Sequence, residues 1–447
     1  MNMSGAALIR IGLILVVLLA SAFGVELFLL RQRNPNAARV VWTETHQTID
    51  GFGGSSADFL DSLTPAQADF FFTTKGIGLS LLRTQIIPDR ATCDAEFREG
   101  GCSESNGQIL NGELATAKLA VARGVTVFST PWSPPGAYKS NGTFKKGGAL
   151  LPSFYSDWAK KLATYVTMMA ANGAPIYAVS VQNEPDLTTD YGSCTYTTQQ
   201  IHDFVPHLYS ALQSAGVTSA KIMIAEQSAW AIDRTSAAMA DPKVAPKVGI
   251  IAAHGYGGKI RPFQTGNARL WQTETSSSSS KYDGSLSDGI RWAQIIHDYL
   301  VVAGVNAWVW WFLTDMPRQG EGTDNAALTD INGNFPKRTF VLGQWSKFVR
   351  PGWSRIGVTY SGPALISAFK DAAGHAFAIV VVNPNNYPVR QEFSLDGFSA
   401  NSVMPWITSD KLFLAAGAQT PVDGTRFTYL LPARSVITFS GRVAPTH

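Results

Sequence analysis

The sequence predicts an α/β protein in which a (β/α)8 TIM barrel is followed by a smaller C-terminal β-sandwich side domain. Three observations indicate this class. Apolar, β-like runs alternate with helical patterns along most of the chain, eight such runs occur, and strand patterns without helices fill the chain after residue 345. Eight βα units are typical of a closed barrel. A doubly wound parallel sheet is the alternative fold.

The barrel strands are predicted from short apolar runs. These cover residues 48–55, 79–86, 125–133, 177–185, 221–228, 248–256, 268–276 and 307–313. Helical patterns lie between them, for example over 151–173 and 285–304. The second pattern is amphipathic and ends at Gly304, a residue type common at helix C-termini. We therefore expect the catalytic barrel to span residues 46–345.

The side domain is predicted from strand patterns separated by Gly, Pro and Asn turns, which are typical of an antiparallel sheet. They cover residues 355–362, 364–371, 376–384, 390–397 and 427–441. We expect this domain to span 346–447. A further strand pattern at 38–45 precedes the barrel, so segment 34–45 is expected to join the side domain.

Residues 1–33 have the pattern of a targeting segment. Arg10 precedes an apolar stretch, and Ala20-Ser21-Ala22 fits the cleavage site of a signal peptide. Residues 11–30 are also long enough to span a bilayer as an N-terminal membrane anchor. In either case the segment predicts a secreted or exported protein, extracellular or periplasmic, and forms no part of the fold.

The charge balance argues against nucleic acid as a partner. The 447-residue chain has a net charge of +3 and no Lys/Arg run, so it lacks a basic stripe. Its seven histidines show no spaced ligand pair, and its glycine-rich stretches match neither dinucleotide-binding nor phosphate-loop spacing. We expect no metal and no cofactor, and a monomeric protein.

The three cysteines are too few for a disulfide scaffold. Cys93 and Cys102 flank a polar loop. They either pair in an oxidising compartment or remain two loop thiols. If they pair, Cys194 is left over.

Two predicted strands end in polar residues that include a carboxylate. In VSVQNEP an apolar run passes into Asn183 and Glu184, and Pro185 stops the strand; RLWQTET changes in the same way at Glu274. The carboxyl ends of barrel strands surround the active site, and the fourth and seventh strands face each other. Two carboxylates there suit glycoside cleavage: one protonates the leaving oxygen, and the other meets the developing oxocarbenium ion.

Several stretches after residue 40 match one enzyme family. They are IDGFGGSSADF, LLRTQI, STPWSPPGAYKSNG, VSVQNEPD, HGYGG, LWQTETS, KFVRPGW and LPARSVITF. Through them the chain resembles glycoside hydrolase family 30, a retaining family with a (β/α)8 barrel and a β-sandwich side domain. The resemblance implies that Glu184 is the general acid/base and Glu274 the nucleophile. It also implies that Asn183 binds the sugar 2-hydroxyl and that Arg83 keeps the nucleophile ionised. Before the first step, Glu184 should be protonated and Glu274 ionised.

Other strand-end residues are candidates for substrate binding. Trp132 and Trp311 are expected to form walls of the sugar site, with the barrel core as the alternative. Either Trp310 or Trp311 faces the cleft, because adjacent strand residues point to opposite sides. Tyr256 is expected to hydrogen-bond the nucleophile, while His254 either joins the site or packs as a core histidine.

Two further charged residues complete the candidate site. Glu226 ends another strand and is expected to be a binding or structural partner rather than a catalytic group. Arg318 follows the eighth strand and is a candidate to bind a glucuronate side group, because arginine pairs bidentately with carboxylates. The chain lacks the Arg/Tyr-rich loop of glucuronate-dependent bacterial xylanases, so a solvated Arg318 is the alternative.

The predicted substrate is a β-linked polysaccharide or oligosaccharide. SPPGAYKSNG, QNEPDLTTDYGSCTYT and RPGW resemble the xylanase-like branches of the family, which predicts an endo-β-1,4-xylanase acting on glucuronoxylan or arabinoxylan. An endo-β-1,6-glucanase or another β-glycosidase of the family is the alternative. A carbohydrate-binding protein that has lost activity is the non-enzyme alternative, and the presence of both carboxylates argues against it.

Overall fold

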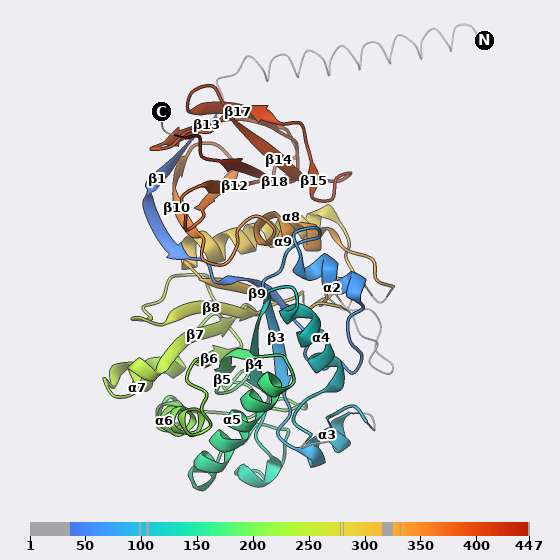
Figure 1. Ribbon diagram of the computed structural model, residues 1–447, viewed down its shortest axis with the longest axis vertical. Coiled ribbons are helices and arrows are strands. Elements are labelled where there is room, and N and C mark those ends of the chain that lie inside the picture. The colour runs from blue at the N-terminus through green and yellow to red at the C-terminus, as the bar shows by residue number, and fades with distance from the viewer. Residues whose placement is uncertain are drawn as a thin grey trace, which may run out of the picture.

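The computed structural model describes residues 36–97, 100–103, 107–277, 279, 281–314, 325–330 and 332–445. It consists of a closed barrel and a curled β-sheet, with helices α8 (Leu286–Asp298) and α9 (Lys337–Ser346) between them (Figure 1). The predicted targeting segment, residues 1–33, lies outside the described residues. Within the described part, no helix is both long and apolar enough to cross a bilayer.

Eight parallel strands close the barrel, which confirms the predicted fold and rules out the doubly wound sheet. The strands are β2 (Gly51–Ser55), β3 (Leu81–Ile86), β4 (Thr126–Pro131), β5 (Ile176–Ser180), β6 (Lys221–Gln227), β7 (Val248–His254), β8 (Arg269–Glu274) and β9 (Ala307–Phe312). The other α-helices of the described residues are α2 (Pro65–Phe72), α3 (Arg90–Glu96), α4 (Asn111–Val121), α5 (Tyr155–Ala171), α6 (Thr198–Ser214) and α7 (Ser236–Ala240). The predicted strand at 177–185 ends at Ser180, because the following polar residues leave the sheet to form the rim.

The alternation of strand side chains separates an apolar barrel interior from a polar mouth. In β3, Leu81 and Arg83 are two residues apart and so lie on the same face of the strand, which is the inward face because Leu81 packs in the barrel interior. Phe128 and Thr130 repeat this change in β4. Leu81 and Phe128 belong to the apolar cluster inside the barrel, which also contains Ala178, Met223, Ile250, Ala252, Trp271, Ala307 and Val309. One strand thus contributes both to the packed core and to the site above it.

The side domain is one curled sheet of ten strands in the order β15-β14-β18-β12-β11-β10-β1-β13-β17, with β16 beside β14. The strands are β1 (Asn36–Thr48), β10 (Ser354–Tyr360), β11 (Leu365–Lys370), β12 (Ala376–Asn383), β13 (Val389–Asp396), β14 (Ser402–Thr408), β15 (Ala415–Ala416), β16 (Thr420–Pro421), β17 (Arg426–Leu431) and β18 (Ser435–Arg442). The strand ahead of the barrel, β1, is antiparallel to β10 but parallel to β13. The sheet is therefore mostly rather than wholly antiparallel. The barrel and strands β10, β11 and β12 lie between β1 and β13 in the chain, so no hairpin constrains the direction of this pair.

Buried hydrogen bonds join this sheet to the helix that precedes it. Gln344 of α9 donates from Nε2 to Thr408 Oγ1 at 2.9 Å, and Thr438 Oγ1 donates to the Gln344 carbonyl at 2.6 Å. Lys337 Nζ, at the start of α9, donates to the carbonyl of Ser409 at 2.6 Å. Because a buried polar group without a hydrogen-bond partner is costly, these bonds favour one orientation of the sheet relative to the barrel.

Cys93 of α3 and Cys102 form a disulfide, with their Cα atoms 6.3 Å apart. This decides between the two options left open by the sequence. Cys194 is free and fully buried, and burial raises the pKa of its thiol to about 12. The Cys194 thiol is therefore protonated and unreactive in the folded protein.

This pairing predicts a thiol count. Native protein should show no rapidly reacting thiol, unfolded but unreduced protein should show one, and unfolded reduced protein three. Titration with a thiol reagent measures each number, and the Cys194→Ser variant should lower the last two by one. Three thiols in unfolded, unreduced protein would contradict the disulfide.

Candidate active site

The guanidinium of Arg83 forms the floor of the barrel mouth. Its side chain is fully buried. It donates to Glu274 Oε2, to Asn183 Oδ1 at 2.7 Å and to Glu226 Oε1 at 3.2 Å. These partners follow or end three other barrel strands. Arg83 therefore joins three other predicted site residues, which come from different parts of the chain, into one cluster.

Glu184 and Glu274 face each other across this floor. Glu184 follows β5 and Glu274 ends β8, and their exposed fractions are 6% and 5%. One carboxylate oxygen of each, together with one ring nitrogen of His254, lies within 4.8 Å of the others. Double displacement uses a short separation of about 5–5.5 Å between the carboxyl groups, whereas inversion needs about 6.5–9.5 Å. The geometry suits a retaining reaction.

The backbone is strained where two of the rim carboxylates lie. Glu184 has φ 44°, Glu226 has φ 45°, and Ala225 has φ 77°. Each such left-handed conformation of a residue with a side chain costs on the order of 1–3 kcal/mol. The backbone N–H of Glu184 donates to the Glu226 carbonyl at 3.0 Å, so the two strained segments support each other. Strain concentrated here indicates that the carboxylate positions are functionally constrained.

His254, at the end of β7, lies among three carboxylates. Its Nδ1 is 3.1 Å from Glu184 Oε1 and 3.8 Å from Glu274 Oε2, and its Nε2 is 3.6 Å from Glu226 Oε1. Burial alone lowers the pKa of His254, but Glu274, Glu184 and Glu226 outweigh it and raise the pKa to about 9. His254 is therefore part of the candidate active site rather than a histidine that only packs in the core. It lies there as an imidazolium that donates to Glu184.

The pKa shifts of Glu184 and Glu274 run opposite to the protonation states expected from the sequence, a protonated Glu184 and an ionised Glu274. Burial raises the pKa of Glu184, but the hydrogen bond and charge of His254, with Arg83, lower it overall. Burial raises the pKa of Glu274, although His254 and Arg83 oppose the shift. The expectation of a protonated Glu184 ignored His254, which competes for the same proton.

The triad of Glu184, His254 and Glu274 also has spacing suited to a metal ion. A metal would require a deprotonated His254 Nδ1, and it would face the guanidinium that already donates to Glu274. Charge-assisted hydrogen bonds to Arg83 and His254 satisfy these carboxylates without an ion.

Two tyrosines contact the facing carboxylates. Tyr256 donates its hydroxyl to Glu274 Oε1 at 2.8 Å, the contact that we expect from the sequence. Tyr191 donates to Glu184 Oε2 at 3.2 Å, and the sequence reasoning missed it. Tyr191 lies in an irregular loop, where no periodicity indicates which side chain turns inward. The two tyrosines are 49% and 42% exposed, for Tyr191 and Tyr256 respectively, so the mouth is open on this side.

Trp132 and Trp311 form one wall of the mouth. Their ring centroids are 5.8 Å apart, and the guanidinium carbon of Arg83 lies 4.8 Å from the first ring and 5.6 Å from the second. Trp310 is buried instead, stacks edge-on to Trp292 at 4.5 Å and donates Nε1 to the Ala326 carbonyl at 2.6 Å. Of the two adjacent tryptophans, Trp311 therefore faces the cleft.

The remaining candidates differ in access. Glu226 is fully buried beneath the mouth and accepts from Thr130 Oγ1 at 3.0 Å, which favours a structural partner over a sugar contact. Asn183 is buried beside Arg83. Arg318 lies outside the described residues.

Thr130 is a further residue of the site that was not predicted from the sequence. The alternation of β4 could have indicated it, because Thr130 lies two residues after the inward-facing Phe128.

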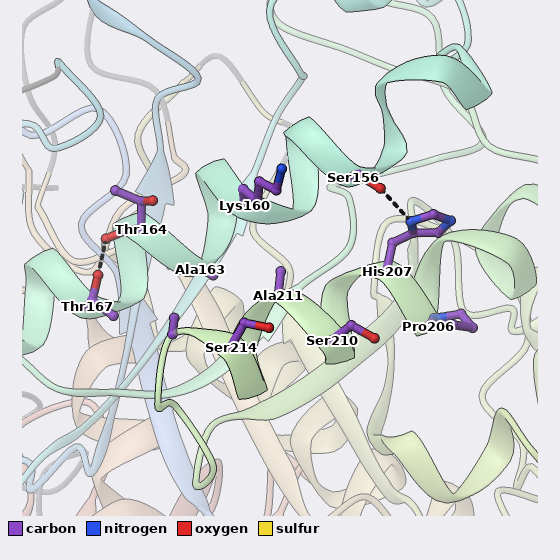
Figure 2. A pocket seen from close by; sticks show the side chains of 11 residues that line it. Ser156, Lys160, Ala163, Thr164, Thr167, Pro206, His207, Ser210, Ala211 and Ser214 are labelled. Carbon is purple, nitrogen blue, oxygen red and sulfur yellow. Dashed lines mark hydrogen bonds between the residues drawn. The ribbon is translucent and has the colours of Figure 1, made fainter.

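A second hollow lies outside the barrel, between α5 and α6 (Figure 2). In it, Ser156 Oγ and His207 Nδ1 are 3.0 Å apart, and Thr167 Oγ1 donates to the Thr164 carbonyl at 2.8 Å. The described residues that line it include no carboxylate. Its side chains are mostly alanines and hydroxylated residues, so the paired acid chemistry belongs to the barrel mouth.

Comparison with known proteins agrees with this geometry. Residues 111–287 match the family model described as "Glycosyl hydrolase family 30 TIM-barrel domain". Glucuronoxylanase XynC of Bacillus subtilis (strain 168) is 31% identical over 416 residues, which cover 88% of this chain and 89% of that protein. An endo-1,6-beta-D-glucanase of Neurospora crassa is 29% identical over 164 residues, 31% of this chain and 34% of that protein. The crystal structure of the family 30 subfamily 8 xylanase Xyn30A of Clostridium acetobutylicum has a TM-score of 0.79 at 32% identity, covering 91% of this chain and 99% of that one. The chain belongs to glycoside hydrolase family 30.

Proposed function

We propose that this protein is a retaining endo-β-1,4-xylanase in which Glu184 is the general acid/base and Glu274 the nucleophile. The observation that carries the proposal is the close approach of these two carboxylates, within 4.8 Å, in the mouth of a (β/α)8 barrel. The similarity to a glucuronoxylanase and to a family 30 xylanase over most of the chain supports xylan as the substrate. A β-1,6-glucanase is the second candidate, supported by a similarity over 31% of the chain.

In the first step, a Glu274 oxygen attacks the anomeric carbon while Glu184 protonates the departing glycosidic oxygen. Arg83 and Tyr256 each hold one oxygen of Glu274, so the carboxylate enters the reaction already oriented. Arg83 also fixes Asn183 Oδ1, which leaves the Asn183 amide N–H groups to donate to the sugar 2-hydroxyl. A hydrogen bond there strengthens in the oxocarbenium-like transition state.

In the second step, Glu184 removes a proton from water, and the hydroxide attacks the same anomeric carbon from the face that the leaving group vacated. The bond to Glu274 breaks, and the product keeps the β configuration. His254 donates to Glu184 and so stabilises the ionised carboxylate that acts as a base in this step. Two displacements on opposite faces account for net retention.

The aromatic wall supports sugar binding next to the reacting bond. Trp132 and Trp311 present ring faces near Arg83, and Tyr191 lies on the open side of the mouth. Aromatic faces bind the apolar C–H surfaces of sugar rings. We assign these side chains to the subsites next to the cleaved bond. Arg318 is kept as the candidate for binding a glucuronate side group, with a solvated Arg318 as the alternative.

We also propose that the protein acts outside the cytoplasm as a monomer, with residues 1–33 as a signal peptide or a membrane anchor. The apolar stretch after Arg10 and the Ala20-Ser21-Ala22 site support export. N-terminal sequencing of the exported protein distinguishes a cleaved segment from a retained anchor, and light scattering measures the oligomeric state.

The substrate proposal predicts which polymers are cleaved. Purified protein should release oligosaccharides from glucuronoxylan and arabinoxylan, and fresh products should have the β configuration by proton NMR. Chromatography of parallel digests of β-1,6-glucan and an aryl β-glycoside provides the comparison. Release from the glucan alone would favour the second candidate function, a β-1,6-glucanase. Fresh products with the α configuration would contradict a retaining reaction.

The nucleophile assignment predicts that Glu274→Ala loses activity on the order of 10⁴-fold or more, because no covalent intermediate can form. The fold should survive, since the residue lies at the rim and removal of its charge leaves Arg83 paired with Glu226. Initial rates and thermal unfolding measure the two effects. A variant that keeps most of its activity would show that Glu274 is not the nucleophile.

The acid/base assignment predicts a dependence on the leaving group. Glu184→Ala should slow xylan cleavage by about 10²–10⁴-fold. Formation of the intermediate from an aryl glycoside with an acidic phenol should be slowed far less, because such a leaving group departs without a proton. Pre-steady-state bursts with both substrates make the comparison. Equal losses would remove this role from Glu184.

A further inference from the structure

Glu226 is a third carboxylate of the site, and the proposed reaction does not use it. Its side chain has no solvent exposure, and it accepts from Arg83 Nη2 at 3.2 Å and from Thr130 Oγ1 at 3.0 Å. His254 Nε2 lies 3.6 Å from Glu226 Oε1. Burying a carboxylate is costly, because its partners must offset the loss of hydration. The position of Glu226 therefore calls for an explanation.

The backbone of β6 departs from regular strand geometry to bring this carboxylate inward. Met223 belongs to the barrel interior, so regular alternation would also turn Ala225 inward and Glu226 outward. Instead, the pairing of β6 with β7 shifts between Ala225 and Gln227, and Ala225 and Glu226 both adopt positive φ angles. A bulge of this kind re-aims a side chain. Here it aims the Glu226 carboxylate at His254 and Arg83.

The charged and titratable groups that face this pair come from every neighbouring strand. Arg83 lies on β3, Glu184 and Tyr191 follow β5, Tyr256 follows β7, and Glu274 ends β8. Together with Glu226 there are three carboxylates, and with His254 protonated there are two cations. Arg83 contacts Glu226 and Glu274, which leaves His254 to bridge Glu226 and Glu184.

We infer that Glu226 is a positioning residue that keeps His254 as an imidazolium, one ring nitrogen facing Glu226 and the other donating to Glu184. His254 and Glu184 then share one acidic proton, which serves the acid/base step. The pair delivers one proton to the glycosidic oxygen and regains one from water when the intermediate is hydrolysed, so protons balance over a turnover. This inference rests on the proposed function of the site.

The sign of the effect follows from charge. An anion beside His254 raises the pKa of the pair, and the pKa of Glu226 itself is held at about 2, despite burial, by Arg83 and His254. Glu226 is therefore ionised throughout the working range. Its neutralisation should lower the pH at which the pair loses the shared proton, because one of the charges that stabilise the imidazolium is gone.

The test compares pH profiles of kcat/KM for xylan cleavage by the full-length protein. In Glu226→Gln the basic limb should move down by about one pH unit, so the loss relative to wild type should be about twofold larger at pH 8 than at pH 5 and approach about tenfold at pH values above the wild-type limb. Glu226→Asp keeps the charge and should keep the limb near its wild-type position. Glu113→Gln is the matched control. Glu113 is a buried carboxyl outside the site, and burial raises its pKa, so this change removes a buried carboxyl while leaving the anion beside His254 in place.

A second readout does not depend on activity. In protein labelled with ¹⁵N-histidine, the signals of His254 are assigned by their loss in His254→Gln. Wild-type His254 should carry protons on both ring nitrogens at pH 7.5, and its titration midpoint should fall by about one unit in Glu226→Gln. This measurement on the wild-type protein remains decisive if the variant fails to fold.

The outcomes separate this inference from the proposed function. A neutral wild-type His254 at pH 7.5, or a Glu226→Gln enzyme with uniform loss at every pH, would overturn the role of Glu226. The reaction itself would stand as long as the Glu184 and Glu274 variants behave as expected. Full activity in those two variants would instead refute the reaction.

Discussion

The contact between the buried guanidinium of Arg83 and the carboxylate of Glu274 is the interaction on which the rest of the site depends. Three buried carboxylates converge at the barrel mouth, and without a fixed cation they would repel one another and protonate. Arg83 contacts two of them and also orients Asn183. Leaving a buried charge without its partner costs about 3–5 kcal/mol, so the guanidinium and the carboxylates stabilise one another only as a set.

The barrel supplies what this set requires. Leu81 and Phe128 fill the interior two residues before Arg83 and Thr130, so the packed core directly supports the charged floor. The positive φ angles of Glu184 and Glu226 are tolerated because the surrounding strands, and the hydrogen bond between their backbones, over-determine them. The fold's stability thus offsets local strain at the carboxylates, and His254 joins them into one proton-sharing group.

Much of the fold could be predicted because it depends on local patterns. Alternating strands and helices indicate a parallel barrel, and polar residues at strand ends indicate Glu184 and Glu274. Features that depend on three-dimensional pairing could not be predicted. The inward turn of Glu226 depends on a bulge, the contact of Tyr191 on the path of an irregular loop, and the parallel pairing of β1 with β13 on how the side sheet closes. The protonation state of His254 depends on carboxylates from three separate strands.

The most direct test of the proposed chemistry is to trap the covalent intermediate. A 2-fluoro xylobioside with an acidic phenol leaving group destabilises both oxocarbenium-like transition states, while the good leaving group still allows the first step, so the intermediate should accumulate. Mass spectrometry of the digested protein should find the sugar on a peptide that contains Glu274, attached to that side chain. A label on any other residue, or rapid turnover without a covalent adduct, would contradict Glu274 as the nucleophile.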